Sequence, residues 1–157
     1  MTNKYFPEDE ITFNDLYFVC YMIERVARRL HQHNAYVVNT IGKDELYHLL
    51  SVADALHCEN PLDVEDTWIQ DYVLQPGCFD IAAVDHELCS VIPSETSIGK
   101  VYARLIRDTL LPDENYVDGI MRVYNNEISE TIDNYNGSAY YEPSYVIVRA
   151  YNEGGFN

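Results

Sequence analysis

Histidine, cysteine and carboxylate side chains are the groups that could ligate a metal or move a proton, so their spacing is considered first. Asp54, His57 and Cys58 could meet within one helical turn, but a zinc site there needs a fourth ligand from elsewhere in the chain. His57 and Cys58 are adjacent, so on a helix they point about 100° apart. A base must lie within hydrogen-bond reach of its nucleophile. We therefore expect neither a bound metal nor a nucleophile pair in this stretch.

A second acid–base group lies further along, where Asp85, His86 and Glu87 precede Cys89. His86 and Cys89 are three residues apart, so they would share one face of a helix. Triplets of this kind arise by chance in an acidic chain. We therefore expect no catalytic residue in this group.

Longer motifs give no stronger signal. The pair Gly99-Lys100 lacks the glycine five residues earlier that a phosphate-binding loop requires. No GxGxxG, HExxH, GxSxG or EF-hand pattern occurs. We expect a non-enzymatic protein without a cofactor. The alternative is a small enzyme or ligand-binding domain with its site near His57 or His86.

Charge is the most unusual property of the composition. The chain of 157 residues has 10 basic and 26 acidic residues, a formal net charge of −16. Residues 43–95 contain twelve of the acidic residues and only one basic residue. A domain this negative repels phosphate backbones and anionic membranes, so we expect no direct nucleic-acid or membrane partner. The acidic stretch is either a solvated surface or a contact face for a basic partner protein.

Tyrosine is the second compositional feature. Five of the 14 tyrosines lie between positions 135 and 151. Tyrosine is enriched at binding surfaces, and it also covers cores with its hydroxyl at the surface. We expect partner binding by C-terminal tyrosines close to acidic residues. The predicted partner-binding residues are Tyr140, Tyr141, Tyr145, Glu65, Asp66 and Asp71.

The elements that position these residues follow from apolar periodicity. Leu16, Cys20, Ile23, Ala27 and Leu30 recur at steps of four and three, which predicts an amphipathic helix over 13–30. Comparable stripes and caps predict further helices that begin near 43, 61, 81, 95 and 117, the last running to about 135.

Two segments are ambiguous. The stretch 35–41 is typical of a short strand, an extended linker or a helical turn. Residues 144–150 favour a strand by propensity, but a proline at position 143 and the spacing favour a helix, which we predict. The expected fold is mainly α, a single compact domain of six or seven helices over 13–152. Residues 1–12 are expected to be flexible and 153–157 a loose tail.

The cysteines and the apolar runs bear on the compartment. Cys20, Cys58, Cys78 and Cys89 contain no CxxC pair. The longest uncharged apolar run, 16–23, is far shorter than the ~20 residues of a membrane helix. No apolar signal segment is evident. We expect a cytoplasmic protein with reduced thiols.

The first half of the chain resembles a known group of proteins. Residues 18–24, with the sequence FVCYMIE, and residues 55–57, with the sequence ALH, are similar to small helical bacterial proteins often encoded beside toxin-like ADP-ribosyltransferases. The similarity runs from about 16 to 72, roughly a third of the chain, and includes no catalytic motif. It implies a bacterial accessory or antitoxin-like protein and assigns no functional residue.

Overall fold

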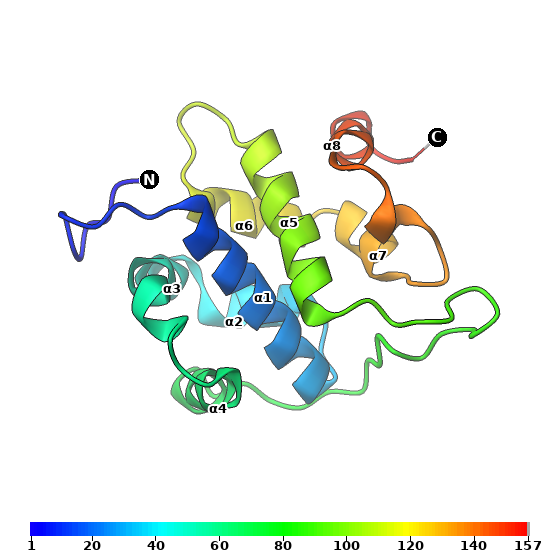
Figure 1. Cartoon of the computed structure of the whole chain (residues 1–157), viewed down its shortest axis with the longest axis horizontal. Coiled ribbons are helices and arrows are strands. Elements are labelled where there is room, and N and C mark those ends of the chain that lie inside the picture. The colour runs from blue at the N-terminus through cyan, green and yellow to red at the C-terminus, as the bar shows by residue number, and fades with distance from the viewer. Residues whose placement is uncertain (157) are drawn as a thin grey trace.

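The N-terminal helix, α1 (Phe13–Leu30), is the central element of the structure (Figure 1). It begins at a reciprocal cap in which the Thr12 hydroxyl accepts from the Asp15 amide and the Asp15 carboxylate accepts from the Thr12 amide. Its predicted apolar stripe is buried, with Ile23 fully enclosed. The computed structural model describes residues 1–156.

Helix α5 (Glu95–Thr109) packs along α1, and glycine makes the close approach possible. A Cβ atom at Gly99 would lie 2.7 Å from the Tyr21 Cα atom, so a larger residue would push the two helices apart. Gly119 makes a similar close approach to α5, where a Cβ would lie 2.7 Å from Ile106 Cγ2.

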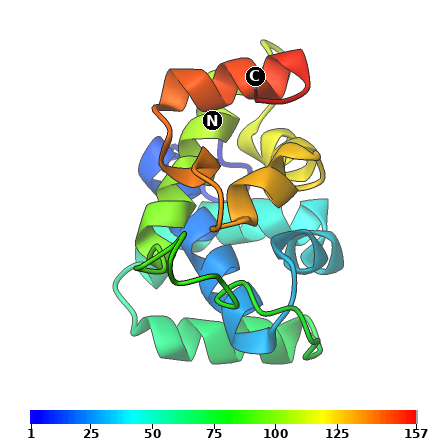
Figure 2. The same cartoon turned by 90° about the vertical axis from the view of Figure 1, so that its right-hand side faces the viewer.

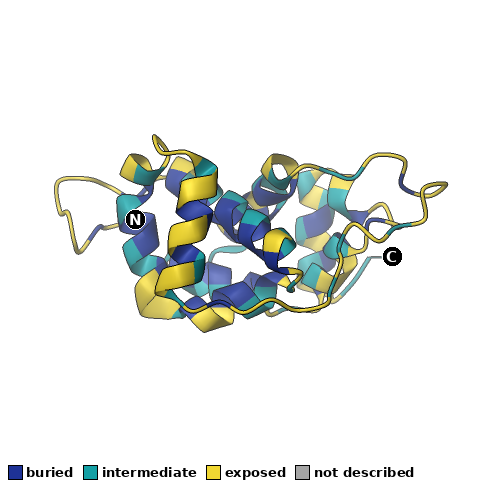
Figure 3. Ribbon diagram, turned by 90° about the horizontal axis from the view of Figure 1, so that it is seen from below, coloured by how far each residue is buried: buried dark blue, intermediate teal, exposed yellow. Residues whose placement is uncertain are grey.

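The remaining elements surround this pair. They are α2 (Asn34–Ile41), α3 (Lys43–Leu56), α4 (Pro61–Asp71), α6 (Tyr116–Tyr124), α7 (Ile128–Asp133), the 3₁₀ turn η1 (Ala139–Tyr141) and α8 (Ser144–Glu153). Figures 1 and 2 agree that α4 and α8 lie at opposite ends of the molecule. Figure 3 shows buried helix faces turned inward and largely exposed connecting loops.

The prediction of a mainly α, single compact fold is confirmed, with eight α-helices and no strand among residues 1–156. The segment 35–41 lies in α2, so the strand and linker alternatives are wrong. The segment 144–150 lies in α8, as predicted. Residues Val37, Val38 and Ile147 are buried on the inner faces of these helices, so packing outweighs their β propensity.

The helix predicted over 117–135 is two helices, α6 and α7. The break lies at two asparagines whose side chains bond to the backbone. The Asn125 amide donates to the Met121 carbonyl, and the Asn126 side chain accepts from the Ile128 amide. Such local bonds compete with helix continuation.

The helix predicted over 81–88 does not form. The Asp80 carboxylate accepts from the Ala82 amide, and the Asp85 carboxylate accepts from the Glu87 amide, so turns replace the helix. The connection between α4 and α5 is nonetheless held in place. The Gly77 amide donates to Leu30 O at 2.7 Å, and the Phe79 amide donates to His31 O at 2.9 Å.

The two terminal segments make specific contacts. In the segment 1–12, Asn3 is buried and its side chain donates to Ser51 O, while Ile11 belongs to the core. At the other end, α8 extends through position 153 and Phe156 packs partly against the core. Position 157 of the predicted tail lies outside the described residues.

All four cysteines are free thiols, two buried and two exposed. None of the helices within residues 1–156 combines the length and the apolarity needed to cross a membrane.

Candidate functional site

The predicted partner-binding residues fall into two separate groups. Tyr140, Tyr141 and Tyr145 lie on η1 and α8, whereas Asp66 and Asp71 lie on α4, at the opposite end of the molecule (Figures 1 and 2). The expectation that tyrosines and carboxylates share one face is therefore not met. The positions of these residues in the sequence do not show that the two groups lie at opposite ends of the fold.

Glu65 has a different environment from the other predicted carboxylates. It is 3% exposed, because α4 turns it toward α1. There it accepts from Arg25 Nε at 2.7 Å and lies 3.8 Å from Arg29 Nη1. Asp66, beside it, is exposed and pairs with Arg29 at 2.7 Å. Glu65 holds α4 to α1 and is not a surface carboxylate.

Three of the C-terminal tyrosines pack ring against ring in a row from the interior to the surface. Tyr135 is buried, Tyr140 is half-buried, and their rings meet edge to face at 5.2 Å. Tyr141 packs on Tyr140 at 4.9 Å and is 67% exposed. Tyr145 is 71% exposed. Of the three predicted tyrosines, only Tyr141 and Tyr145 offer much surface to a partner.

Neither of the two histidines named for an alternative site lines the principal cavity, although His86 follows the lining residue Val84 by two positions. His57 ends α3 and stacks on Phe18 at 5.2 Å. His86 is exposed in the α4–α5 connection. The Cys58 thiol donates only to the Asp54 carbonyl, at 3.8 Å. Among residues 1–156, no three His, Cys, Asp or Glu side chains are grouped so that they could hold a metal ion.

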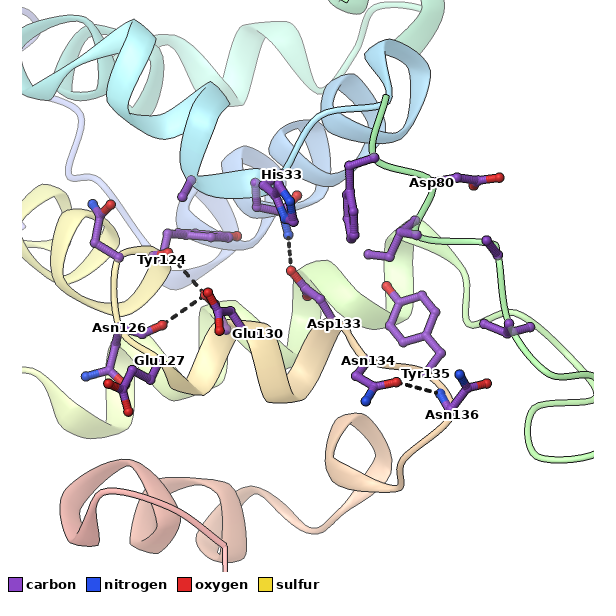
Figure 4. A pocket seen from close by; sticks show the side chains of 18 residues that line it. His33, Asp80, Tyr124, Asn126, Glu127, Glu130, Asp133, Asn134, Tyr135 and Asn136 are labelled. Atoms are coloured by element: carbon purple, nitrogen blue, oxygen red, sulfur yellow. Dashed lines mark hydrogen bonds between the residues drawn. The ribbon is translucent and has the colours of Figure 1, made fainter. Parts of the chain in front are cut away.

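The principal cavity lies elsewhere, with a volume of about 520 Å³, which is within the range of small-molecule sites. Four parts of the chain line it: the start of α2, residues 79–84 of the α4–α5 connection, the α6–α7 junction, and residues 133–136. Figure 4 looks into this cavity, with Asp133 between Tyr124 and Tyr135 and directed toward the start of α2.

The Asp133 carboxylate is the centre of the cavity wall. It accepts a hydrogen bond from the Tyr102 hydroxyl at 2.7 Å and a longer one from Asn34 Nδ2 at 3.5 Å. The same Asn34 amide donates to Glu24 Oε1 at 3.0 Å. Asn34 therefore bridges two carboxylates, one on the wall and one behind it.

Arg28 is the cation of this network. Its Nε donates to Glu24 at 3.0 Å, and its Nη2 donates to the Tyr135 hydroxyl at 2.9 Å. It also lies 3.5 Å from the partly exposed Glu95. Glu24 is only 1% exposed, so it depends on this guanidinium for compensation.

The charges of this network do not balance. Arg28 hydrogen-bonds to Glu24, whereas it acts on Asp133 only through its charge, without a direct ion pair among the described residues. Burial raises the pKa of the Asp133 carboxyl well above its usual range, and the negative charge of Glu24 raises it further. Burial likewise raises the pKa of Glu24, although Arg28 opposes that change. The inner wall of the cavity is therefore short of positive charge.

The rim of the cavity continues this pattern. Asp80, Glu127 and Glu130 contribute three more carboxylates, and none of the described lining residues is lysine or arginine. His33 and Phe79 stack at 3.7 Å between ring centroids and join α2 to the α4–α5 connection. The arrangement of carboxylates, amides and aromatic rings can hold a cation.

Sequence reasoning missed this site, but one signal was present. Glu24 lies within the apolar stripe of α1, one turn after Cys20 and three residues before Ala27. A carboxylate on a core-facing stripe must find a buried partner. Asn34 follows ten residues later and Asp133 lies far along the chain, and neither spacing predicts a contact with Glu24, so only the fold identifies them. Comparisons of the chain with family models, curated proteins and solved structures found no match.

Proposed function

We propose that this chain is a non-enzymatic acidic interaction module, antitoxin-like or regulatory, that acts in the bacterial cytoplasm by binding a partner protein with a basic surface. The proposal rests on the surface formed by α3, α4 and the turn between them, here termed the acidic surface. Its exposed carboxylates are those of Asp44, Glu45, Asp54, Glu59, Asp63, Asp66 and Asp71.

The single observation that carries the proposal is the lack of compensating charge on this surface. Lys43 is the one basic residue between positions 43 and 95, and it pairs with Asp118 on α6 at 3.0 Å. Asp66 pairs with Arg29, and Glu45 lies near His48. The other five carboxylates have no ion pair among the described residues. An uncompensated field of this kind steers a basic partner toward the surface.

Charge steers encounter, but affinity needs an apolar anchor. Leu62 on α4 is 56% exposed and lies one residue from Asp63, so it supplies such an anchor within the acidic surface. Tyr141 and Tyr145 lie at the other end of the molecule, so they are not part of the contact that the acidic surface makes.

The test begins with co-expression of the chain and the proteins encoded by neighbouring genes, to obtain a complex. Binding kinetics are then measured for the triple variant Asp63→Asn, Asp66→Asn, Asp71→Asn. We expect a lower association rate and a flatter salt dependence, because surface charges are screened within ~8 Å at physiological ionic strength.

The matched control carries the same charge change at exposed positions outside α3, α4 and the N-terminal segment that contacts α3: Glu87→Gln, Asp113→Asn and Glu153→Gln. This control should bind like the unmodified chain. Equal effects of the two triple variants on the association rate would contradict the proposal, since net charge rather than the acidic surface would then govern binding.

A second candidate role is that of a ligand-binding domain, and the cavity between α2 and α7 favours it. Its volume fits a small molecule, and its inner wall holds a hydrogen-bonded carboxylate. His33 lines this candidate site, and neither His57 nor His86, near which the sequence predicted a site, is among the lining residues.

A further inference from the structure

We propose that the cavity between α2, α7 and the α4–α5 connection binds the cationic end of an alkyl-guanidinium or alkyl-ammonium compound, with the charge placed against Asp133. This inference extends the second candidate role and does not depend on the acidic surface.

The charge of the cavity is the first support. Four carboxylates line it, those of Asp80, Glu127, Glu130 and Asp133, and no described lining residue carries a permanent positive charge. Behind the wall, Arg28 is already engaged by Glu24 and by the Tyr135 hydroxyl. A cation bound in the cavity would supply the compensating positive charge that the Asp133 carboxylate does not receive from Arg28.

The remaining hydrogen-bond capacity of Asp133 is the second support. Its Oδ1 accepts from Tyr102 at 2.7 Å, but its Oδ2 has only the 3.5 Å contact with Asn34. A carboxylate oxygen accepts more than one hydrogen bond. A planar guanidinium or an ammonium group donates several, and charge-assisted bonds of this kind are the strong ones.

The walls of the cavity favour an organic cation over a bare metal ion. The carboxylates are spread around the cavity and do not converge in a group of three. Phe79, Tyr124 and Tyr135 line the cavity, and aromatic rings attract a nearby cation. His33 and Tyr102 already cover one face of Phe79 and one face of Tyr124. Ile81 and Val84 give an apolar side on which a methylene chain can pack.

The helix ends at the cavity carry partial charges of both signs. The C-terminal ends of α6 and α7 reach the cavity and carry partial negative charge, whereas the N-terminal end of α2 carries partial positive charge. Because the N-terminal end of a helix favours anions, inorganic phosphate is the competing probe.

The test is an NMR titration of the whole chain in 150 mM salt with four probes. N-acetyl-L-arginine methylamide presents the guanidinium as a protein side chain does, and n-butylguanidine presents it as a free small molecule of the same charge. N-acetyl-L-citrulline methylamide is the neutral match of the first probe, and inorganic phosphate is the anion. We expect saturable shifts around Asn34, Asp133 and Tyr135 with one or both guanidinium probes, and about tenfold weaker binding or none with citrulline.

The comparison of the two guanidinium probes separates the sources of the ligand. The two guanidinium probes carry the same single charge. Tighter binding of n-butylguanidine therefore indicates a free small-molecule cation, and tighter binding of the arginine amide indicates a side chain of a partner. Either result supports the cavity as a cation site. Equal binding of arginine and citrulline, phosphate binding in the cavity, or shifts confined to α3 and α4 would overturn it.

Variants locate the effect and separate it from the proposed function. Glu130→Gln at the exposed rim and Asp133→Asn on the wall should each weaken guanidinium binding, and Asp113→Asn, remote from the cavity, should not. Glu130→Gln keeps the test valid if Asp133→Asn fails to fold. The triple variant of the acidic surface should bind guanidinium normally. The proposal would be contradicted if Glu130→Gln and a folded Asp133→Asn both bound guanidinium as tightly as the unmodified chain.

Discussion

The contact between α1 and α4 and the inner wall of the cavity are built from the same kinds of residue, but they differ in charge balance. On one side of α1, the buried carboxylate of Glu65 meets two guanidiniums, those of Arg25 and Arg29. On another side, Arg28 hydrogen-bonds to Glu24 and acts on Asp133 only through its charge. The first contact is closed and compensated, and the second is open to a cavity and short of a cation. The comparison teaches that the local balance of buried charge, more than the number of carboxylates, marks a candidate site.

The largest effect should come from the element that both regions share. Ile23 is completely buried in the middle of α1. Ile23→Asp places an uncompensated carboxylate in the core, whose cost approaches the whole stability of about 5–15 kcal/mol of a typical domain. We expect no cooperative thermal transition, measured by circular dichroism. A variant that melts like the unmodified chain would remove α1 from the centre of the fold.

The compensated contact can be broken at Glu65. Glu65→Ala leaves Arg25 and Arg29 without their buried partner, so we expect a loss of about 2–3 kcal/mol, somewhat below that of a fully buried pair. Asp66→Asn is the matched control, because its carboxylate is 61% exposed and its pair with Arg29 should contribute less than about 1 kcal/mol. Urea unfolding measures both. Equal losses would mean that burial does not distinguish the two carboxylates.

The uncompensated wall should reveal itself through pH. The pKa of Asp133 is raised by burial in the folded chain, so its contribution to stability is fully present below the unfolded value near 4 and is lost as pH rises through the folded value. Each unit of rise corresponds to about 1.4 kcal/mol. Asp133→Asn should therefore gain stability relative to the unmodified chain between pH 4 and pH 8.

Urea midpoints across that pH range provide the measurement. Asp113→Asn, which alters an exposed carboxylate, should give a curve parallel to that of the unmodified chain. Glu24, Arg28 and Tyr102 face Asp133 and stay in place in the variant, so the difference reports the coupled Glu24–Asp133 pair. A constant difference between Asp133→Asn and the unmodified chain would refute the charge imbalance.

The smallest expected effect concerns the aromatic support of the cavity. Tyr140 packs against Tyr135, whose hydroxyl accepts from Arg28. Tyr140→Ala should lower stability by about 1 kcal/mol, a fall in Tm of about 2–4 °C for a chain of this length. Tyr145→Ala, at a largely exposed position, should change stability by less than about 0.5 kcal/mol. A larger loss at Tyr145 would place it in the fold instead of on the surface.

The fold could be predicted where local signals agree. The stripe and cap of α1 and the Asn60-Pro61 start of α4 specified their helices, because periodicity, capping and proline all point the same way. The predictions of one continuous helix over 81–88 and over 117–135 were wrong for the same physical reason. The Asp and Asn side chains of these segments bond to the nearby backbone, and apolar periodicity does not register that competition.

The acidic surface could be predicted in part, and the cavity could not. Acidic residues on α3 and α4 are exposed as expected, but Glu65 is not, because its helix face points at Arg25. The network at the cavity wall brings together residues more than a hundred positions apart, such as Glu24 and Asp133, and no local pattern encodes that meeting. The sequence therefore indicated the exposed charges of α3 and α4, but not which carboxylates are buried or what they pair with.

The most direct test of the central claim is a carboxyl-carbon NMR titration of Asp133, with and without N-acetyl-L-arginine methylamide. The charge imbalance predicts a pKa above the ordinary aspartate range in the free chain, and a lower pKa when the guanidinium occupies the cavity, because a nearby cation favours the ionised carboxylate. An ordinary pKa near 4 that the probe leaves unchanged would contradict the account.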